Sequence, residues 1–212
     1  MSAYRSEFLE FAIESGVLCF GEFKTKAGRL SPYFFNAGLF NDGVKVKKLG
    51  EFYAKAIVES GIEFDVLFGP AYKGIPLATS VAISLVGMGR NVPFAFNRKE
   101  AKDHGEGGTV IGAVLTGRVL IVDDVISAGT SVRESVELIR SQKAQLAGVV
   151  IALDRMEKGG GEKSAVQEVQ DEYGMPVLSV VNLADLLTFL QAKADWGDRL
   201  EAVARYREQY GI

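Results

Sequence analysis

The chain has 212 residues, of which 48% are apolar and 24% are charged, and its formal net charge is −3. This composition is typical of a globular protein with one substantial α/β domain, and a mildly acidic charge without a basic stripe argues against a nucleic-acid-binding protein. No apolar run reaches the length of a membrane span, and the single cysteine, Cys19, excludes an internal disulfide framework and a multi-cysteine zinc site. We therefore expect a cytoplasmic protein with neither a nucleic-acid partner nor a membrane partner.

The N-terminal part of the chain predicts a helix, a hairpin and a second helix. In order, these are a helix at 4–20, a hairpin at 23–36 that turns at Ala27-Gly28, and a helix at about 44–60. The first helix is indicated by apolar residues at helical spacing between Phe8 and Ile13. The hairpin mixes polar and aromatic residues without clean alternation. We therefore expect it to belong to a small hood or lid subdomain at about 20–40 rather than to the core sheet.

From residue 66 onward the pattern alternates between strands and helices. Strands are predicted at 66–69, 92–96, 119–122, 148–153 and 177–181, and helices at 75–85, 131–141, 162–174, 183–193 and 196–210. Alternation at these lengths is typical of a parallel sheet with right-handed crossovers, whose ligands gather at the C-terminal ends of the strands. The sequence therefore predicts a single α/β domain over 1–212, with a parallel-sheet core and flanking helices.

The run 119–131 is the most informative stretch of the chain. Four branched apolar residues at 119–122 predict a strand that is buried on both faces, and from Val132 onward the apolar spacing becomes that of a helix. Two acids, Asp123 and Asp124, and a loop of small residues lie between the strand and the helix. The unpaired amides and the dipole at a helix start favour an anion such as phosphate. The neighbouring carboxylates can accept hydrogen bonds from the vicinal hydroxyls of a ribose 5-phosphate.

This stretch matches neither of the common nucleotide-binding loops. No Gly-Lys-Ser/Thr follows the strand, as a Walker loop requires, and the Gly-x-Gly-x-x-Gly fingerprint of dinucleotide-binding domains is absent. An aspartate pair at the end of a strand can also ligate a metal or cap a helix in an ordinary α/β domain. The phosphate loop beside the acids makes a sugar-phosphate site the favoured interpretation.

Residues 97–109 form a second informative segment, which is polar and lies between two predicted core strands. It contains three glycines and the only histidine of the chain, and none of its apolar residues is larger than alanine. We therefore expect a mobile loop that acts as a lid. Its cationic side chains, Arg98, Lys99, Lys102 and His104, are together suited to a highly charged group such as pyrophosphate. For the loop taken alone, a solvated hairpin with an idle histidine is the alternative.

Two further cations lie just after predicted strands. Lys73 lies in a strand-to-helix turn at 68–78, where small residues let the backbone approach a ligand and Pro76 suits the start of a helix. Taken alone, such a turn is structural about as often as it is functional. Arg155 follows the strand that ends in Asp154, and its position suits the binding of a carboxylate. The alternative for Arg155 is an exposed surface arginine.

The aromatic pair Phe34 and Phe35 lies near Lys26 in the predicted hairpin. A flat apolar slot beside a cation suits a planar acidic heterocycle, because rings pack on aromatic faces. Two neighbouring phenylalanines in isolation are more often a hydrophobic staple under a hairpin. The slot is therefore a hypothesis that depends on the other motifs.

Together these motifs resemble the type I phosphoribosyltransferases, and within them the orotate phosphoribosyltransferases. The run Asp-Asp-Val-Ile-Ser-Ala-Gly-Thr-Ser at 123–131 is similar to the phosphoribosyl pyrophosphate motif of the superfamily. Motifs of the orotate family are similar to the segments 31–38, 69–76 and 98–108. The resemblance implies a Rossmann-like type I phosphoribosyltransferase core with a hood, a catalytic loop at 97–109 and a phosphoribosyl pyrophosphate-binding strand, loop and helix at 119–141.

The resemblance also implies a role for each candidate residue. Phosphoribosyl pyrophosphate is expected to contact Lys26, Tyr72, Lys73, Arg98, Lys99, Lys102, His104, Asp123 and Asp124, with its 5-phosphate on Val125, Ile126, Ser127, Ala128, Gly129, Thr130 and Ser131. Orotate is expected to be framed by Phe34, Phe35, Ser127 and Arg155. The catalytic residues implied are Lys102, His104, Asp123 and Asp124, with Lys102 stabilising the leaving group. Many relatives have threonine at the position of Ser127. The serine keeps the hydroxyl of threonine but lacks its methyl group.

The activity implied by the resemblance is the transfer of a ribosyl 5-phosphate group from phosphoribosyl pyrophosphate to orotate, in pyrimidine biosynthesis. The expected cofactor is Mg²⁺, carried mainly by the diphosphate without a direct protein ligand. The expected assembly is a homodimer in which the loop of one subunit closes over the site of its neighbour. The alternatives are a phosphoribosyltransferase for another nucleobase and a non-catalytic regulator that senses phosphoribosyl pyrophosphate. The complete loop and the lack of a basic appendage disfavour the regulator.

Overall fold

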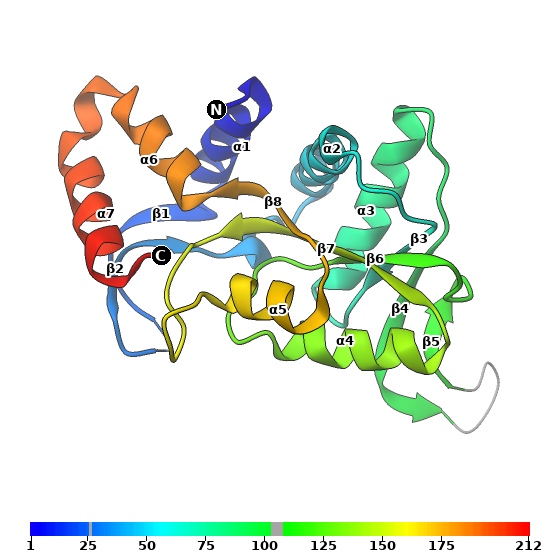
Figure 1. The fold of residues 1–212 in the computed structure, drawn as a ribbon. Helices are drawn as coiled ribbons and strands as arrows, with labels where there is room; N and C mark the ends of the chain where they lie inside the picture. The colour runs from blue at the N-terminus through cyan, green and yellow to red at the C-terminus, as the bar shows by residue number, and fades with distance from the viewer. Residues whose placement is uncertain (26, 103–107) are drawn as a thin grey trace.

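A central sheet with helices on both faces and a two-stranded hairpin at one end form the protein, as the computed structural model in Figure 1 shows. The structure describes residues 1–25, 27–102 and 108–212, with side chains for all of these except residues 101, 102 and 108. The helices are α1 (Ala3–Glu14), α2 (Gly43–Ser60), α3 (Gly74–Gly87), α4 (Thr130–Ser141), α5 (Ala165–Tyr173), α6 (Leu183–Gln191) and α7 (Gly197–Tyr210), with 3-10 turns η1 (Ala37–Leu39) and η2 (Ala194–Trp196). The strands are β1 (Leu18–Lys24), β2 (Leu30–Phe35), β3 (Val66–Gly69), β4 (Phe94–Lys102), β5 (Gly108–Gly112), β6 (Arg118–Val122), β7 (Gln145–Asp154) and β8 (Val177–Asn182).

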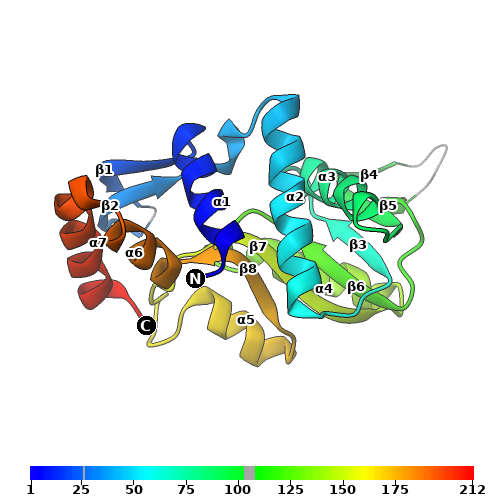
Figure 2. The same ribbon diagram turned by 90° about the horizontal axis from the view of Figure 1, so that it is seen from above.

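The central sheet has the strand order β5-β4-β3-β6-β7-β8. All neighbours in it pair in parallel except β5, which pairs antiparallel with β4 at one edge. Side chains along each strand alternate between the two faces, so one strand contributes to two cores. Leu67 and Leu120 pack on the face covered by α1, α2 and α3, whereas Phe68 and Ile121 pack on the face covered by α4 and α5. Figures 1 and 2 show these helices on opposite sides of the sheet.

Short polar signals fix where several helices begin and end. The carboxylate of Asp42 accepts a hydrogen bond from a first-turn amide of α2, and Gly61 ends the same helix with a left-handed φ of 67°. A capping box of Asn182 and Asp185 starts α6 directly after β8. These local devices agree with the tertiary packing, which explains why the predicted ends of these helices are close to the observed ones.

The hairpin β1–β2 forms a separate antiparallel sheet, as the sequence predicts. Its turn contains Ala27 and Gly28, and Gly28 has a φ of 79°, which is accessible to glycine at little cost. The C-terminal helix α7 lies beside the hairpin (Figure 1), and Tyr33 of β2 packs edge-on against Tyr206 of α7, with ring centroids 6.3 Å apart. The hairpin is therefore covered by a helix from the opposite end of the chain.

The predicted fold class is confirmed: parallel strands and crossover helices form the core, and the hairpin lies outside it. The predicted strands at 66–69, 119–122, 148–153 and 177–181 correspond to β3, β6, β7 and β8. Within the described ranges, none of the helices combines the length and the apolar character that a membrane span requires.

The helix predicted over 4–20 is too long. The helix α1 ends at Glu14, and residues 18–24 form β1 of the hairpin. The backbone turns at Gly16, whose φ of 69° is in the left-handed region that favours glycine. Apolar residues resume at Val17, four positions after Ile13, which is still helical spacing, so the spacing alone does not show that the helix has ended.

The loop predicted at 97–109 is wrong at both ends. The strand β4 continues to Lys102, and β5 begins at Gly108 and pairs antiparallel with it. Backbone pairing needs no apolar side chains. The strand β4 pairs with β3 only up to Phe96, so its residues from 97 onward pair with the edge strand β5 alone, where polar and charged residues are tolerated. The middle of the segment, 103–107, lies outside the described residues, so the predicted mobility of the loop stays a prediction.

Candidate functional site

Three neighbouring strands end at one edge of the sheet and bring predicted ligand-binding residues together. The strands β3, β6 and β7 are consecutive in the sheet and run parallel. Lys73 follows β3, the pair Asp123 and Asp124 follows β6, and Arg155 follows β7. The C-terminal ends of parallel strands are where α/β domains bind their ligands. Four predicted site residues therefore share one edge of the sheet.

The two acids are buried and have different partners. Asp123 and Asp124 are 6% and 8% exposed. The carboxylate of Asp123 accepts hydrogen bonds from the N–H of Asp124 and from the hydroxyl of Ser131, each at 2.9 Å. The carboxylate of Asp124 accepts from Nζ of Lys73 at 2.6 Å and from the N–H of Val125 at 2.9 Å. Lys73 therefore compensates the charge of Asp124, whereas the donors to Asp123 among the residues that the structure describes are neutral.

The pKa of the Asp123 carboxyl group reflects this difference. Burial is the main cause that raises the pKa of Asp123 to about 6, and the charge of Asp124 acts in the same direction. The N–H of Asp124 and the hydroxyl of Ser131 lower the pKa but do not offset burial. The carboxylate is thus short of hydrogen-bond donors, which the hydroxyls of a ribose would supply.

Tyr53 on α2 contacts the backbone of the acid pair. The fully buried hydroxyl of Tyr53 donates to the backbone carbonyl of Asp123 at 2.8 Å. The N–H of Asp123 donates to the carbonyl of Val150 on β7 at 3.1 Å. The apolar pattern of α2 predicts the burial of Tyr53, but nothing in the sequence indicates the partner of its hydroxyl.

The loop after the acids leads into the start of α4. Gly129 stands at this start with a φ of 71°, and a Cβ atom there would lie 3.3 Å from Cγ2 of Val169 on α5. Within the described residues, no side chain caps α4, so its first amides are available to an anion. Of the other predicted phosphate-binding residues, Ser127, Ala128 and Thr130 are exposed and Val125, Ile126 and Ser131 are partly buried. This geometry is suited to a phosphate at a helix start.

The turn between β3 and α3 is shaped by close backbone packing. A Cβ atom on Gly69 would lie 2.1 Å from the carbonyl oxygen of Gly74, so a side chain cannot be placed there without moving the turn. The N–H of Ala71 donates to the side chain of Asn97 on β4 at 2.7 Å, and the peptide bond that follows Ala71 is cis. These contacts hold Lys73 beside the acids.

Two of the predicted loop cations lie on the described part of β4. Arg98 is partly buried and Lys99 is exposed. Nζ of Lys99 lies 5.5 Å from the ring centroid of Tyr72, which is 70% exposed. Lys99 and Tyr72 are therefore neighbours at the turn that carries Lys73. Outside the described residues lie Lys26, His104 and the side chain of Lys102.

The aromatic slot predicted from Phe34 and Phe35 is not formed by both rings. Neighbouring residues on a strand point to opposite faces. Phe34 is 46% exposed and stacks on Phe23 with centroids 5.5 Å apart. The ring of Phe35 packs toward Phe8 and Phe40, at 6.5 Å from each. Only Phe34 presents a ring on an open face of the hairpin, and the ring of Phe35 belongs to the core.

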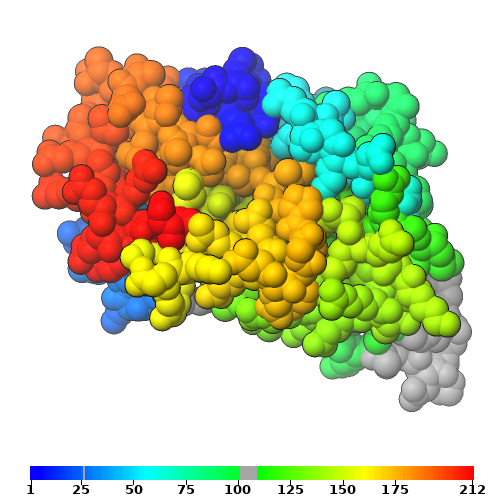
Figure 3. Space-filling view, in the orientation of Figure 1, coloured from blue at the N-terminus to red at the C-terminus, as the bar shows by residue number. Residues whose placement is uncertain are grey.

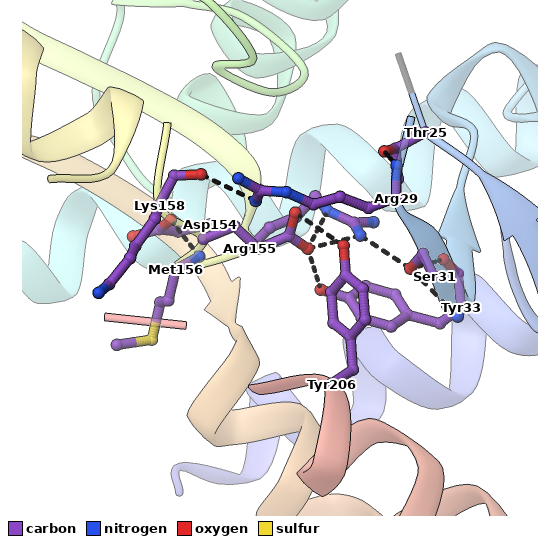
Figure 4. Close-up of polar contacts among 10 residues, drawn as sticks. Thr25, Arg29, Ser31, Tyr33, Asp154, Arg155, Met156, Lys158 and Tyr206 are labelled. Atoms are coloured by element: carbon purple, nitrogen blue, oxygen red, sulfur yellow. Dashed lines mark hydrogen bonds and ion pairs between the residues drawn. The ribbon is translucent and has the colours of Figure 1, made fainter. Parts of the chain in front are cut away.

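Arg155 is held by residues from distant parts of the chain (Figure 4). Its Nη2 donates to the hydroxyl of Ser31 at 2.9 Å, and its Nε donates to the carboxylate of Glu157 at 2.8 Å. Its guanidinium carbon lies 4.2 Å from the ring centroid of Tyr33. The Arg155 side chain is only 24% exposed, so the alternative of a surface arginine is wrong. Sequence reasoning did not single out Glu157, because a lone glutamate in a polar segment carries no signal.

Two hollows lie near these residues. A small one of about 170 Å³ opens beside the ion pair of Lys73 and Asp124 and is otherwise lined by apolar residues from η1, α2 and α3. A wider one of about 500 Å³ lies between the hood hairpin and α7, away from the acids. In the part of the chain that the structure describes, no group of three or more His, Cys, Asp or Glu side chains is arranged to hold a metal ion.

Comparisons with known proteins agree with this geometry. Residues 39–177 match the profile of the phosphoribosyl transferase domain family. The chain is 75% identical to an orotate phosphoribosyltransferase of Thiobacillus denitrificans over 100% of both chains, and 65% identical to one of Nitrosospira multiformis over 99% of this chain and 92% of that protein. The crystal structure of an orotate phosphoribosyltransferase from Francisella tularensis is similar with a TM-score of 0.89 and 40% identity, over 97% of this chain and 100% of that one.

The similarity covers the site as well as the fold. The acid pair, the loop that follows it and Arg155 all lie inside the range that matches the family profile. The relatives of high identity span this chain from end to end. The chain therefore belongs to the orotate phosphoribosyltransferase family of the type I phosphoribosyltransferases.

Proposed function

We propose that the chain transfers the ribosyl 5-phosphate group of 5-phospho-α-D-ribose 1-diphosphate to orotate, giving orotidine 5-phosphate and diphosphate in pyrimidine biosynthesis. The observation that carries this proposal is the acid pair Asp123 and Asp124 at the end of β6, before the loop that starts α4, with Arg155 directly after the neighbouring strand β7. A ribose phosphate needs acceptors for its hydroxyls and donors for its phosphate, and an acidic base needs a cation. This edge of the sheet offers all three.

Each group of site residues has a distinct task in this reaction. Asp123 and Asp124 accept hydrogen bonds from the ribose hydroxyls, and the loop and helix start at 125–131 bind the 5-phosphate. Lys73, which pairs with Asp124 in the structure, lies where it can turn toward the diphosphate. Arg155 binds the carboxylate of orotate.

The chemistry depends on charge that develops in the transition state. The bond from the anomeric carbon to the diphosphate oxygen breaks while a bond to a ring nitrogen of orotate forms. Positive charge develops on the ribose, beside the buried carboxylates of Asp123 and Asp124, and negative charge develops on the diphosphate, beside Lys73. No side chain needs to form a covalent intermediate.

Mg²⁺ is the cofactor that we propose, and its fit to the site follows from the donors present. Asp123 and Asp124 are carboxylates, the oxygen ligands that this ion prefers, but Ser131 and Lys73 already bond to them. We therefore expect the diphosphate to carry most of the ligands of the ion. When bound there, Mg²⁺ supplies Lewis-acid stabilisation of the leaving group.

The test of the proposed reaction is the consumption of orotate, followed by its ultraviolet absorbance. Absorbance should fall only when both phosphoribosyl pyrophosphate and Mg²⁺ are present. Parallel assays with uracil, adenine and xanthine test the alternative of another nucleobase. Turnover of uracil, adenine or xanthine, without turnover of orotate, would show that this other base is the substrate. Binding of phosphoribosyl pyrophosphate without turnover of any base would favour the sensing regulator.

The catalytic loop has its own test. By resemblance, Lys102 stabilises the departing diphosphate, so Lys102→Ala should lower turnover more than about tenfold. The control is Lys47→Ala, because Lys47 is an exposed lysine of α2 that pairs with Glu51. Near-normal turnover of Lys102→Ala would remove this loop from the chemistry.

We further propose a homodimer located in the cytoplasm, where the single free Cys19 stays reduced. Ile83 and Val86 of α3 lie one turn apart and are 68% and 56% exposed, and the neighbouring Met88 is 41% exposed. Such an apolar patch is suited to an interface between copies of the chain. Light scattering should give a dimer mass that Ile83→Glu reduces, and a monomeric parent protein would overturn the assembly proposed here.

A further inference from the structure

Glu157 lies at the centre of the cluster that holds Arg155. One of its carboxylate oxygens, Oε1, contacts both Nε and Nη2 of Arg155, at 2.8 and 2.6 Å. The hydroxyl of Tyr33 donates to the same oxygen at 3.4 Å, and the hydroxyl of Tyr206 donates to Oε2 at 3.1 Å. The side chain of Glu157 is only 15% exposed. Both of its oxygens are thus occupied, Oε1 by Arg155 and Tyr33 and Oε2 by Tyr206. Figure 4 shows Arg155, Tyr33 and Tyr206 close together.

The segment that carries Glu157 is tied to the end of α7. The backbone of Glu157 forms an antiparallel bridge with Gly211, and the N–H of Lys158 donates to the carbonyl of Tyr210 at 2.9 Å. From the hood hairpin, Nη1 of Arg29 donates to the carbonyl of Lys158 at 2.9 Å. Figure 3 shows the C-terminal residues, in red, against the segment that follows β7, in yellow. Glu157 therefore joins the hairpin, the end of β7 and α7.

We propose that Glu157 is a positioning residue for base recognition, which orients the guanidinium of Arg155 and, through Tyr206, couples orotate binding to the packing of α7. The inference rests on the proposed function, in which Arg155 binds the carboxylate of orotate. Glu157 and Ser31 engage Nε and Nη2, and the two N–H groups of Nη1 take part in none of these contacts. These contacts fix Nε and Nη2, and in this inference the Nη1 edge of the guanidinium is the one that meets the ligand.

Orientation before binding has a physical benefit. A free arginine side chain has many rotamers, and ordering it when the ligand arrives reduces affinity. Here the ring of Tyr33 lies against the guanidinium on one side, and Glu157 and Ser31 hold its edge. Orotate then binds to a donor pair that is already fixed. A change in Glu157 should therefore alter the KM for orotate and not the KM for phosphoribosyl pyrophosphate.

The test uses three variants of the full chain and one control. Glu157→Ala should raise the KM for orotate about tenfold, and Glu157→Gln, which keeps an acceptor oxygen, should restore it to within about threefold of the parent. Tyr206→Phe removes one donor to Glu157 and should raise this KM about threefold. The KM for phosphoribosyl pyrophosphate should stay unchanged in all three. The control is Glu162→Ala, whose exposed carboxylate pairs with Lys158 in the same segment.

A merely structural role would give a different result. Loss of folded enzyme lowers kcat and leaves both KM values unchanged, and such a result would overturn the positioning role. If Glu157→Ala does not fold, Tyr206→Phe decides, because phenylalanine keeps the ring volume. An unchanged KM for orotate in Tyr206→Phe would then overturn the inference.

A double-mutant cycle separates this inference from the function on which it rests. If Glu157 acts through Arg155, Glu157→Ala should add nothing to the KM for orotate of Arg155→Ala. An unchanged KM for orotate in Arg155→Ala itself would show that the assignment of Arg155 is wrong. A raised KM in Arg155→Ala together with an unchanged KM in Glu157→Ala would overturn only the positioning role.

Discussion

The two halves of the site are constructed in different ways. The phosphate-binding half, residues 119–131, is one strand, one loop and one helix start. It contains contacts between near neighbours, such as that of the hydroxyl of Ser131 with the carboxylate of Asp123, and longer contacts reach it from Lys73 and Tyr53. The base-binding half joins Ser31, Arg155 and Tyr206, which come from three separate segments. The first half depends mainly on the geometry of a buried strand and a turn. The second half exists only when the hood hairpin, β7 and α7 are packed together.

This contrast has a consequence for function. Local contacts persist when distant elements move, whereas a cluster made from distant segments loosens with any one of them. Changes in the phosphate-binding half should therefore alter the kinetics of phosphoribosyl pyrophosphate and leave orotate recognition intact. Loosening α7 should have the opposite effect.

Asp124→Asn should have the largest effect on catalysis. The substitution removes a charged acceptor for a ribose hydroxyl and the partner of Lys73. A hydrogen bond to a charged group contributes about 1.5–3 kcal/mol, so kcat/KM for phosphoribosyl pyrophosphate should fall about 100-fold. Initial rates at varied concentrations of each substrate provide the measurement. The control is Asp171→Asn, which removes an exposed carboxylate that pairs with Lys163. A comparable rise in the KM for orotate would show that the two halves are not independent.

Asp123→Asn should stabilise the protein at neutral pH. The carboxyl of Asp123 has a pKa near 3.8 in an unfolded chain and about 6 in the fold. The folded state therefore binds the proton more tightly, and stability is lost as the pH rises from about 4 to about 6. Asparagine cannot ionise, so at pH 8 the variant should gain roughly 2–3 kcal/mol at most. Its stability should also depend less on pH.

Urea unfolding of the parent and of Asp123→Asn at pH 5 and pH 8 measures this effect. The difference between the two proteins should be larger at the higher pH. The same pH dependence in both would contradict the raised pKa. A gain in stability together with a loss of activity would show that the phosphate-binding half keeps a costly buried charge for its ligand.

Gly129→Ala should disturb the phosphate-binding half alone. The residue has a φ of 71°, and a Cβ atom would lie 3.3 Å from Val169, so either the loop or α5 must shift. A left-handed alanine costs about 1–2 kcal/mol, and the KM for phosphoribosyl pyrophosphate should rise about tenfold. The matched control is Gly160→Ala, because no atom lies within 4 Å of a Cβ there and its φ is not in the left-handed region. An equal effect of both substitutions would contradict the role given to the conformation of Gly129.

The same contrast explains what could be predicted from the sequence. The strand and loop at 119–131 were identified because a buried parallel strand, two acids and a small-residue turn are contiguous in the chain. Helix ends such as Asp42 and Gly61 are also local signals. In the base-binding half the sequence indicates Arg155 by its position after a strand, but not the residues that hold it. The contact of Glu157 with Tyr206 joins residues 49 positions apart that meet only through packing.

Two errors have physical causes that the sequence does contain. Phe34 and Phe35 were assigned to one slot, although consecutive residues of a strand point to opposite faces. The polar pattern of 97–102 predicts a loop, although residues of β4 that extend past its pairing with β3 and pair with β5 alone need no apolar side chains. In both cases the position of the side chains depends on the backbone conformation, which the residue types alone do not determine.

Tyr53→Phe should have the smallest effect, and it tests whether a distant contact supports the phosphate-binding half. Its hydroxyl is a long-range contact to the phosphate-binding half, because it reaches the carbonyl of Asp123 from α2. Removing one buried hydrogen bond costs about 1 kcal/mol of stability. If the hydroxyl also fixes the position of the acid pair, the KM for phosphoribosyl pyrophosphate should rise about threefold, and the KM for orotate should not change. The control is Ser80→Ala, which removes another buried hydroxyl from the adjacent helix α3. Loss of stability in both variants, with a KM change in neither, would show that the phosphate-binding half is held by its local contacts alone.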